Sequence, residues 1–128
     1  SVLYEASVSE LFVPYMDPAD GWNNRAFIDA GQFFATSPFI QPLKPGLDCP
    51  THATWFDAVF PSETGSPKLH SRLACLFERH PESPAWRHGE DGEIFGRPTR
   101  QLVLRTAAVV GNYDYLMDWR FDPDGAIE

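Results

Sequence analysis

The sequence predicts a mainly β protein arranged as part of an antiparallel β-sandwich, on three observations. Its 12 prolines and 9 glycines fall between short apolar runs, a spacing typical of short strands joined by turns. No segment sustains a 3.6-residue apolar period, so helix is expected to be scarce. The longest apolar stretch, residues 101–121, carries bulky side chains on both faces, which favours a strand covered on both sides.

The first third of the chain predicts one strand, one short element and turns. Apolar side chains alternate at period two between Val2 and Val13, and Pro14 ends the run, so we expect a strand there. A turn-rich stretch follows from Asp17 to Asn24, and a short element from Ala26 to Gly31. A loop is expected at the backbone-restricting residues Pro38, Pro42, Pro45 and Gly46.

The middle of the chain predicts a hairpin. Strands are expected from Thr51 to Phe60 and from Leu69 to Arg79, and residues 61–67 between them have the composition of a hairpin loop. A polar stretch, His80 to Gly96, separates this hairpin from the last strand.

The longest strand is expected from Gln101 to Phe121. The turn sequence Asp122-Pro123-Asp124-Gly125 follows, and residues 126–128 look like the start of a returning strand. A long strand without its full return partner would expose backbone groups that another strand can pair with. We therefore expect residues 1–128 to be a single, truncated domain, completed by further polypeptide or by dimerisation.

Charge narrows the class of partner. Ten basic residues among eighteen acids give a net charge of −8, which argues against nucleic acid, because phosphate binding needs clustered Lys and Arg. No apolar run approaches the length that spans a bilayer, so no membrane partner is expected. An acidic surface attracts cations such as protonated amines.

Two cysteines, Cys49 and Cys75, are compatible with one disulfide or with two buried thiols. A bridge would imply a secreted location or another oxidising compartment. It would close a loop of about 27 residues, worth about 3.5 kcal/mol on the chain-entropy model.

One motif stands out near the end of the chain, Val109-Val110-Gly111-Asn112-Tyr113-Asp114-Tyr115. It resembles the cofactor-forming strand of the copper amine oxidases, in which the tyrosine after asparagine is oxidised in place to topaquinone. The resemblance continues in family order along the chain. It includes Val13-Pro14-Tyr15-Met16-Asp17-Pro18, the segment Ala26-Phe27-Ile28-Asp29-Ala30-Gly31-Gln32, the segment Leu76-Phe77-Glu78, and Trp86-Arg87-His88.

This resemblance implies a role for each matched residue. Tyr113 would be the topaquinone precursor, and Asn112 would help to orient the quinone. Asp29 would be the base that takes a proton from the substrate carbon, in a pocket whose apolar neighbours raise its pKa. Cys49 and Cys75 fall where the family has a disulfide. From the residues alone, Tyr113 is a core aromatic on a strand and Asp29 caps a turn.

Copper and topaquinone are the cofactors of intact relatives, but none is expected in this chain alone. The copper ligands of the family are three histidines, two of them in a His-x-His pair, downstream of the tyrosine strand. The four histidines here show no such spacing, and we expect no metal site from them: His52, His70, His80 and His88.

Three functions remain open. The first is copper amine oxidase chemistry, which converts primary amines to aldehyde, ammonia and hydrogen peroxide. The second is a copper-free, stand-alone enzyme that uses Asp29 and Tyr113 for acid–base or cyclisation chemistry on an apolar metabolite. The third is a non-catalytic binding module. Four departures from the family pattern make the expected pocket more apolar and favour the second function: Met16, Gln32, Phe77 and Val109.

Overall fold

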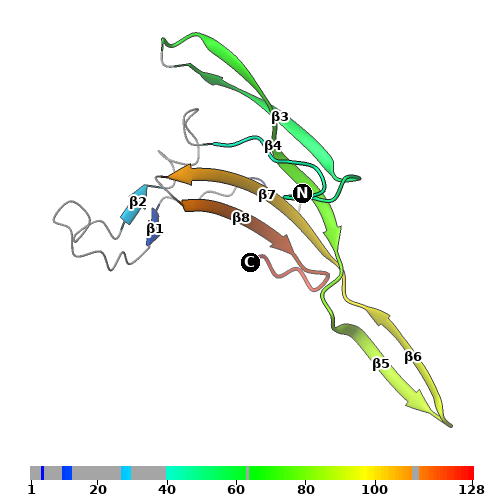
Figure 1. The fold of residues 1–128 in the computed structure, drawn as a ribbon. Coiled ribbons are helices and arrows are strands. Elements are labelled where there is room, and N and C mark those ends of the chain that lie inside the picture. Colours follow the sequence, from blue (N-terminus) through cyan, green and yellow to red (C-terminus); the bar gives the residue numbers. More distant parts are fainter. Residues whose placement is uncertain (1–3, 5–9, 13–26, 30–39, 63, 111–112) are drawn as a thin grey trace.

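The computed structural model describes residues 4, 10–12, 27–29, 40–62, 64–110 and 113–128, which form eight β-strands and no helix (Figure 1). Every strand pairing is antiparallel. The mainly β, antiparallel fold class is therefore confirmed. No helix of the described residues is long and apolar enough to cross a membrane.

A four-stranded sheet is the largest unit of the structure. Its strands lie in the order β3 (Thr54–Pro61), β4 (Pro67–Arg79), β7 (Gln101–Val110) and β8 (Tyr113–Phe121). The strands expected at residues 51–60 and 69–79 are confirmed as β3 and β4. So is the turn between them, in which Ser62 N–H donates to the Ser66 carbonyl and Gly65 adopts a positive φ of 81°.

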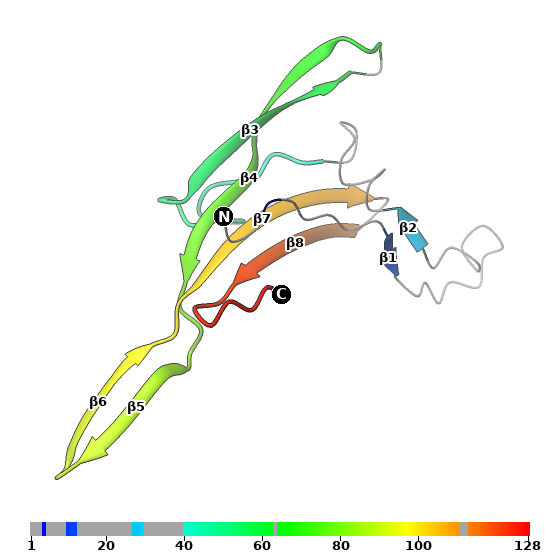
Figure 2. The same ribbon diagram turned by 180° about the vertical axis from the view of Figure 1, so that it is seen from behind.

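The β3–β4 pair contains an irregularity that bends its outer half away from the sheet (Figures 1 and 2). The register shifts between Phe56 and Ala58, and opposite this point Arg72 has a left-handed φ of 56°. Asp57 stabilises this conformation, because its Oδ1 accepts the Arg72 N–H at 2.7 Å. The Arg72 carbonyl in turn accepts the N–H of Leu43 at 2.8 Å.

The single long strand expected from Gln101 to Phe121 is wrong, because the chain reverses in its middle. Val110 pairs with Tyr113, so β7 and β8 form a hairpin with only Gly111 and Asn112 between them. Gly-Asn between two apolar runs is a signal for a two-residue hairpin connection. The apolar residues on both sides of this dipeptide obscure that signal.

The returning strand expected after the Asp122–Gly125 turn is confirmed at its first residues. Gly125 N–H donates to the Asp122 carbonyl at 3.0 Å, and Phe121 forms an antiparallel bridge with Ile127. Arg120 and Glu128 exchange two backbone hydrogen bonds of 2.9 and 3.0 Å. The edge of β8 is thus paired near residue 121.

The core lies on one face of the four-stranded sheet, under residues 40–53. The register places Trp55, Cys75, Val103 and Phe77 on this face, where Leu43, Cys49 and Ala53 pack against them. The opposite face is less covered. Its apolar side chains include Phe56 and Leu102, both 43 % exposed. Within the described part of the chain, burial is therefore concentrated on one side of the sheet.

A two-stranded ribbon occupies most of the polar stretch, which the sequence analysis did not identify as strand. It consists of β5 (Pro84–Glu90) and β6 (Glu93–Pro98), and it projects from the sheet in both views (Figures 1 and 2). Asp91 and Gly92 connect the strands with φ values of 50° and 83°, as a type I′ turn requires. All its side chains are exposed, so the ribbon has no apolar alternation that could reveal it.

A short separate pair comprises β1 (Glu10–Phe12) and β2 (Phe27–Asp29). The strand expected from Val2 to Val13 is confirmed only at β1, and the element expected at residues 26–31 appears as β2. The remainder of both expectations, with the turn-rich stretch at 17–24, lies outside the described residues.

Candidate functional site

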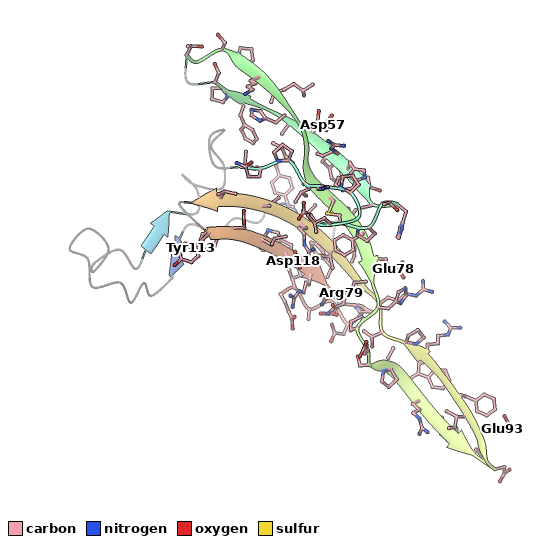
Figure 3. The ribbon with its side chains drawn as sticks, viewed as in Figure 1. Asp57, Glu78, Arg79, Glu93, Tyr113 and Asp118 are labelled. Carbon is pink, nitrogen blue, oxygen red and sulfur yellow. A yellow bond between two sulfur atoms is a disulfide. The ribbon has the colours of Figure 1, made fainter. Side chains whose placement is uncertain are left out.

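Tyr113, the expected cofactor precursor, is the first residue of β8. Its partner in the hairpin is Val110, and its side chain is 53 % exposed. Its ring centroid lies 6.4 Å from that of Tyr115, with a tilt of 51° between the rings. Figure 3 places Tyr113 at the end of the sheet remote from the ribbon. The residue is therefore a half-exposed strand-end tyrosine and not a buried core aromatic.

The other two expected catalytic residues are less fully described. Asn112 lies outside the described residues. Asp29 is the last residue of β2 and pairs with Glu10 of β1. Both stay predictions, as does the apolar pocket expected around Asp29.

Cys49 and Cys75 form a disulfide, as the resemblance implied, with their Cα atoms 6.6 Å apart. Both residues are buried, at 3 % and 0 % exposure. The bridge ties the segment of residues 40–53 to β4, and it holds that segment over the core face of the sheet.

A second feature of this face is an ion pair that the sequence analysis did not identify. Arg105 of β7 donates from Nε to Asp118 Oδ1 at 2.6 Å and from Nη2 to Asp118 Oδ2 at 2.7 Å. Its Nη1 donates to the Asp48 carbonyl at 2.6 Å, and the guanidinium carbon lies 5.4 Å from the centre of the Phe77 ring. One side chain thus joins β7, β8 and the segment that carries Cys49.

This pairing changes the acidity of both groups. The hydrogen bonds from Arg105 hold the pKa of the Asp118 carboxyl below its ordinary value, and partial burial opposes the shift. The same hydrogen bonds raise the pKa of the Arg105 guanidinium. Once β7 and β8 are recognised as a hairpin, their register places Arg105 opposite Asp118. A cross-strand charge pair is the signal that could have revealed them.

Among the described residues, no group of three or more His, Cys, Asp or Glu side chains could hold a metal ion. His80 lies 3.6 Å from Glu78, and His88 lies 3.5 Å from Glu90, in two exposed pairs. His70 contacts the edge of the Phe60 ring at 6.0 Å between centroids. The fourth histidine, His52, lies in the segment of residues 40–53, so the described histidines do not form a ligand group.

Clefts occur elsewhere on the molecule. One of about 320 Å³ lies between residues 46–50 and the side chains of Phe77, Arg79 and Arg105. Another of about 580 Å³ lies where the ribbon joins the sheet. Neither lining includes Tyr113.

Comparison with known families gives a match along the entire chain. The family model described as copper amine oxidase, enzyme domain, matches residues 1–128.

The sequences of plant enzymes are similar to this chain. The copper-containing amine oxidase gamma 1 of Arabidopsis thaliana is 45 % identical over 132 residues, which cover 99 % of this chain and 18 % of that protein. The primary amine oxidase of Pisum sativum is 40 % identical over 133 residues, covering 99 % and 19 %. The chain spans about a fifth of the length of these relatives.

Solved structures show the same fold. The copper-containing benzylamine oxidase of Hansenula polymorpha superimposes with a TM-score of 0.72 at 27 % identity, over 93 % of this chain and 19 % of that one. An amine oxidase from Aspergillus nidulans gives a TM-score of 0.74 at 24 % identity, over 93 % and 16 %.

Proposed function

The chain belongs to the copper amine oxidase family, and on that premise we propose that it takes part in the oxidation of primary amines, with Tyr113 as the quinone precursor. A primary amine, dioxygen and water would give an aldehyde, ammonia and hydrogen peroxide. The amine carbon loses two electrons and dioxygen receives them, so the reaction balances with oxygen as the only oxidant.

The position of Tyr113 is the observation that carries this proposal. It begins β8 directly after the two-residue connection from β7, at the place of the family motif, and its ring is half exposed. A tyrosine that is to be oxidised in place must be reachable by oxygen and by a metal. A ring on an exposed strand end meets that need better than a ring packed in the core.

Asp29 is the proposed base. The quinone, when present, supplies an electrophilic carbonyl that makes the neighbouring carbon of the bound amine acidic. The role of this chain's own carboxylate is then to accept the proton from that carbon. The net charge of −8 supports an amine substrate, because an acidic surface attracts an ammonium ion.

The described residues do not provide a ligand set for copper. The histidine pairs with Glu78 and Glu90 are exposed and far apart in the fold, on β4 and on the ribbon. We propose that any copper ligands come from polypeptide other than these residues, and we assign no step to the metal.

Pairing with a second copy of the chain is also proposed. The ribbon is exposed along both strands, and it carries large apolar side chains, with Trp86, Ile94 and Phe95 at 49 %, 65 % and 52 % exposure. Trp86 and Phe95 lie on the same face of the ribbon, and exposed apolar groups of this kind mark interaction surfaces. Light scattering should give the mass of a dimer, and a monomer at all concentrations would contradict this part of the proposal.

The test of function is a quinone-specific stain on the natural protein after copper loading, with peptide mass analysis to locate the modification. We expect staining that Tyr113→Phe abolishes and Tyr115→Phe retains. Asp29→Asn should lower turnover of benzylamine by about a hundredfold or more without loss of the stain, whereas Asp91→Asn, at the exposed turn of the ribbon, serves as a matched control. An unmodified Tyr113 in the copper-loaded protein would overturn the proposal and favour the copper-free enzyme.

A further inference from the structure

Four readily oxidised side chains follow one another along one face of β8. Tyr113, Tyr115, Met117 and Trp119 occupy every second position of the strand, and β8 pairs with β7 along this stretch without a shift in register. Alternate residues of a strand point to the same side of its sheet. These four side chains therefore form a continuous row, which we call the β8 row.

The other face of β8 has a different chemistry. It presents two carboxylates, an aliphatic group and a guanidinium, none of which gives up an electron easily: Asp114, Leu116, Asp118 and Arg120. The phenols, the thioether and the indole of the strand are thus all segregated on one side of the sheet.

The neighbouring strand insulates the β8 row. On the same face, β7 presents small or aliphatic side chains that are hard to oxidise, with Ala108, Thr106 and Leu104 opposite Tyr115, Met117 and Trp119. If packing alone had selected the residues of this face, aliphatic side chains would serve on β8 as they do on β7. The two strands therefore differ in how easily their side chains are oxidised.

The spacing within the β8 row is short. The ring centroids of Tyr113 and Tyr115 lie 6.4 Å apart, and a strand advances about 6.6 Å over two residues, so Met117 and Trp119 follow at a similar spacing. The polarisable thioether of Met117 lies between two aromatic groups, the kind of neighbour that it contacts favourably. Because electron tunnelling weakens steeply with distance, a series of short steps can carry an electron where one long step cannot.

The direction of the β8 row leads away from the expected cofactor position. β8 runs from Tyr113 toward the end of the sheet that carries the ribbon (Figure 1). At about 3.3 Å per residue, Trp119 lies about 20 Å along the strand from Tyr113. Trp119 is partly exposed, so a reductant in solution can reach it.

We propose that the β8 row carries oxidising equivalents from Tyr113 to Trp119, so that a Tyr113 that has lost one electron is returned to its phenol. This role rests on the proposed function, because quinone formation needs an intact phenol at residue 113. The oxidant is a hydroxyl radical formed from hydrogen peroxide, the product of the proposed reaction. It takes a hydrogen atom from the phenol, becomes water and leaves a phenoxyl radical.

The electrons and protons balance along the β8 row. The Tyr113 phenoxyl takes an electron from Tyr115 and a proton from water, and Tyr115 releases its phenolic proton to water. The same exchange between Tyr115 and the indole N–H of Trp119 moves the radical to Trp119, with the electron passing Met117. A soluble reductant such as ascorbate then supplies one electron, and water one proton, to restore the indole.

The test is flash photolysis of the metal-free natural protein, in which residue 113 is still a tyrosine. A ruthenium polypyridyl photosensitiser is attached to the thiol of an Asp114→Cys variant, because Asp114 is exposed and adjoins Tyr113 on the other face of β8. Cys49 and Cys75 are buried in their disulfide and do not compete for the label. With an electron acceptor in solution, a flash oxidises the label. We expect the absorption of a tyrosyl radical first, then that of a tryptophanyl radical, which ascorbate removes.

Matched variants locate the path. Trp119→Phe should lose the tryptophanyl signal, whereas Trp86→Phe removes an indole from the ribbon and should retain it. Tyr115→Phe should leave the radical at residue 113 and also lose the tryptophanyl signal, whereas Tyr4→Phe, which changes a tyrosine that is 96 % exposed, should not. Tyr115→Phe removes a single oxygen atom, so it keeps the test valid if Trp119→Phe lowers the urea midpoint.

The outcomes separate this proposal from the proposed function. A tryptophanyl signal that survives Trp119→Phe or Tyr115→Phe, or its absence from the unsubstituted β8 row, would overturn the transfer path even in a protein that stains for quinone. A protein that never forms the quinone could still pass the radical from Tyr113 to Trp119, because the flash experiment needs neither copper nor turnover.

Discussion

Arg105 and Asp118 face each other across the β7–β8 hairpin and are joined by two hydrogen bonds of 2.6 and 2.7 Å. Their side chains are only 22 % and 12 % exposed. The same guanidinium holds the Asp48 carbonyl next to Cys49. This pair therefore links the strand that begins at Tyr113 to the disulfide-anchored segment.

Removal of this guanidinium should destabilise the fold. Arg105→Ala leaves the Asp118 carboxylate and the Asp48 carbonyl without their donor, and we expect a loss of about 1–3 kcal/mol in the free energy of unfolding. Urea denaturation would measure it. Arg100→Ala is the matched control, because its ion pair with Glu78 is exposed and should contribute less than about 1 kcal/mol. Equal losses in the two variants would contradict the special role of Arg105.

The stability should also depend on pH through Asp118. Its pKa is lowered in the folded state, so its contribution is fully present above the ordinary carboxyl pKa of about 3.9 and is lost as the pH falls through the lower folded value. We expect the urea midpoint to fall as the pH is lowered below about 4. Asp118→Asn should lower the urea midpoint at neutral pH and make the midpoint depend less on pH in the acid range. If the midpoint of the variant fell with pH as steeply as that of the wild type, other carboxyl groups would be the cause of the fall.

Reduction of the Cys49–Cys75 bridge should lower stability substantially. The cysteines are 26 residues apart in sequence, and a loop of that length is worth about 3.5 kcal/mol in the chain-entropy account. Denaturation with and without a reducing agent gives the difference. The double variant Cys49→Ala/Cys75→Ala should match the reduced wild type and show no further response to reductant. If reduction left the denaturation midpoint unchanged, the bridge would not be a stabilising element.

The ribbon should be sensitive to a methyl group at one glycine and tolerant at another. A Cβ at Gly96 would lie 2.7 Å from the Trp86 carbonyl oxygen, whereas one at Gly89 would lie 3.7 Å from the Glu93 carbonyl oxygen. Gly96→Ala must therefore push the two strands apart, because the clash is with backbone. We expect amide exchange in the ribbon to accelerate by about tenfold or more, and Gly89→Ala to leave it nearly unchanged. Similar amide exchange rates in the two variants would contradict the close approach of Gly96 to the Trp86 carbonyl.

The sequence predicts much of this fold where one face of a strand is buried. Residues 54–61 and 67–79 alternate or carry apolar runs, and their strands appear within a few residues of the expected bounds. The ribbon escapes prediction because neither of its faces packs on a core, although its Asp91-Gly92 turn has the composition of a hairpin. The hairpin between β7 and β8 is not predicted, because both strands are apolar. Two residues between them do not interrupt the apolar pattern of the sequence enough to indicate a turn.

The candidate site is predictable only to the extent that it is local in sequence. A short motif singles out Tyr113, whose role as cofactor precursor stays a prediction, and the Cys49–Cys75 disulfide that the family resemblance implied is present. The Arg105–Asp118 pair depends on register, which the hairpin decides. The cleft at the base of the ribbon joins Trp86, Arg100 and Pro123 from three segments, and no linear pattern brings such residues together.

The segment that contains the ribbon can change in length or sequence without opening the four-stranded sheet. Arg79 at the end of β4 pairs directly with Gln101 at the start of β7, so the sheet would remain closed if a short turn joined these two residues. Residues 80–100 are in this sense an insertion into an ordinary hairpin, with its own turn and no share in the core. Such a segment can be lengthened, shortened or exchanged during evolution or by design without altering the strands that carry Arg105, Asp118 and Tyr113.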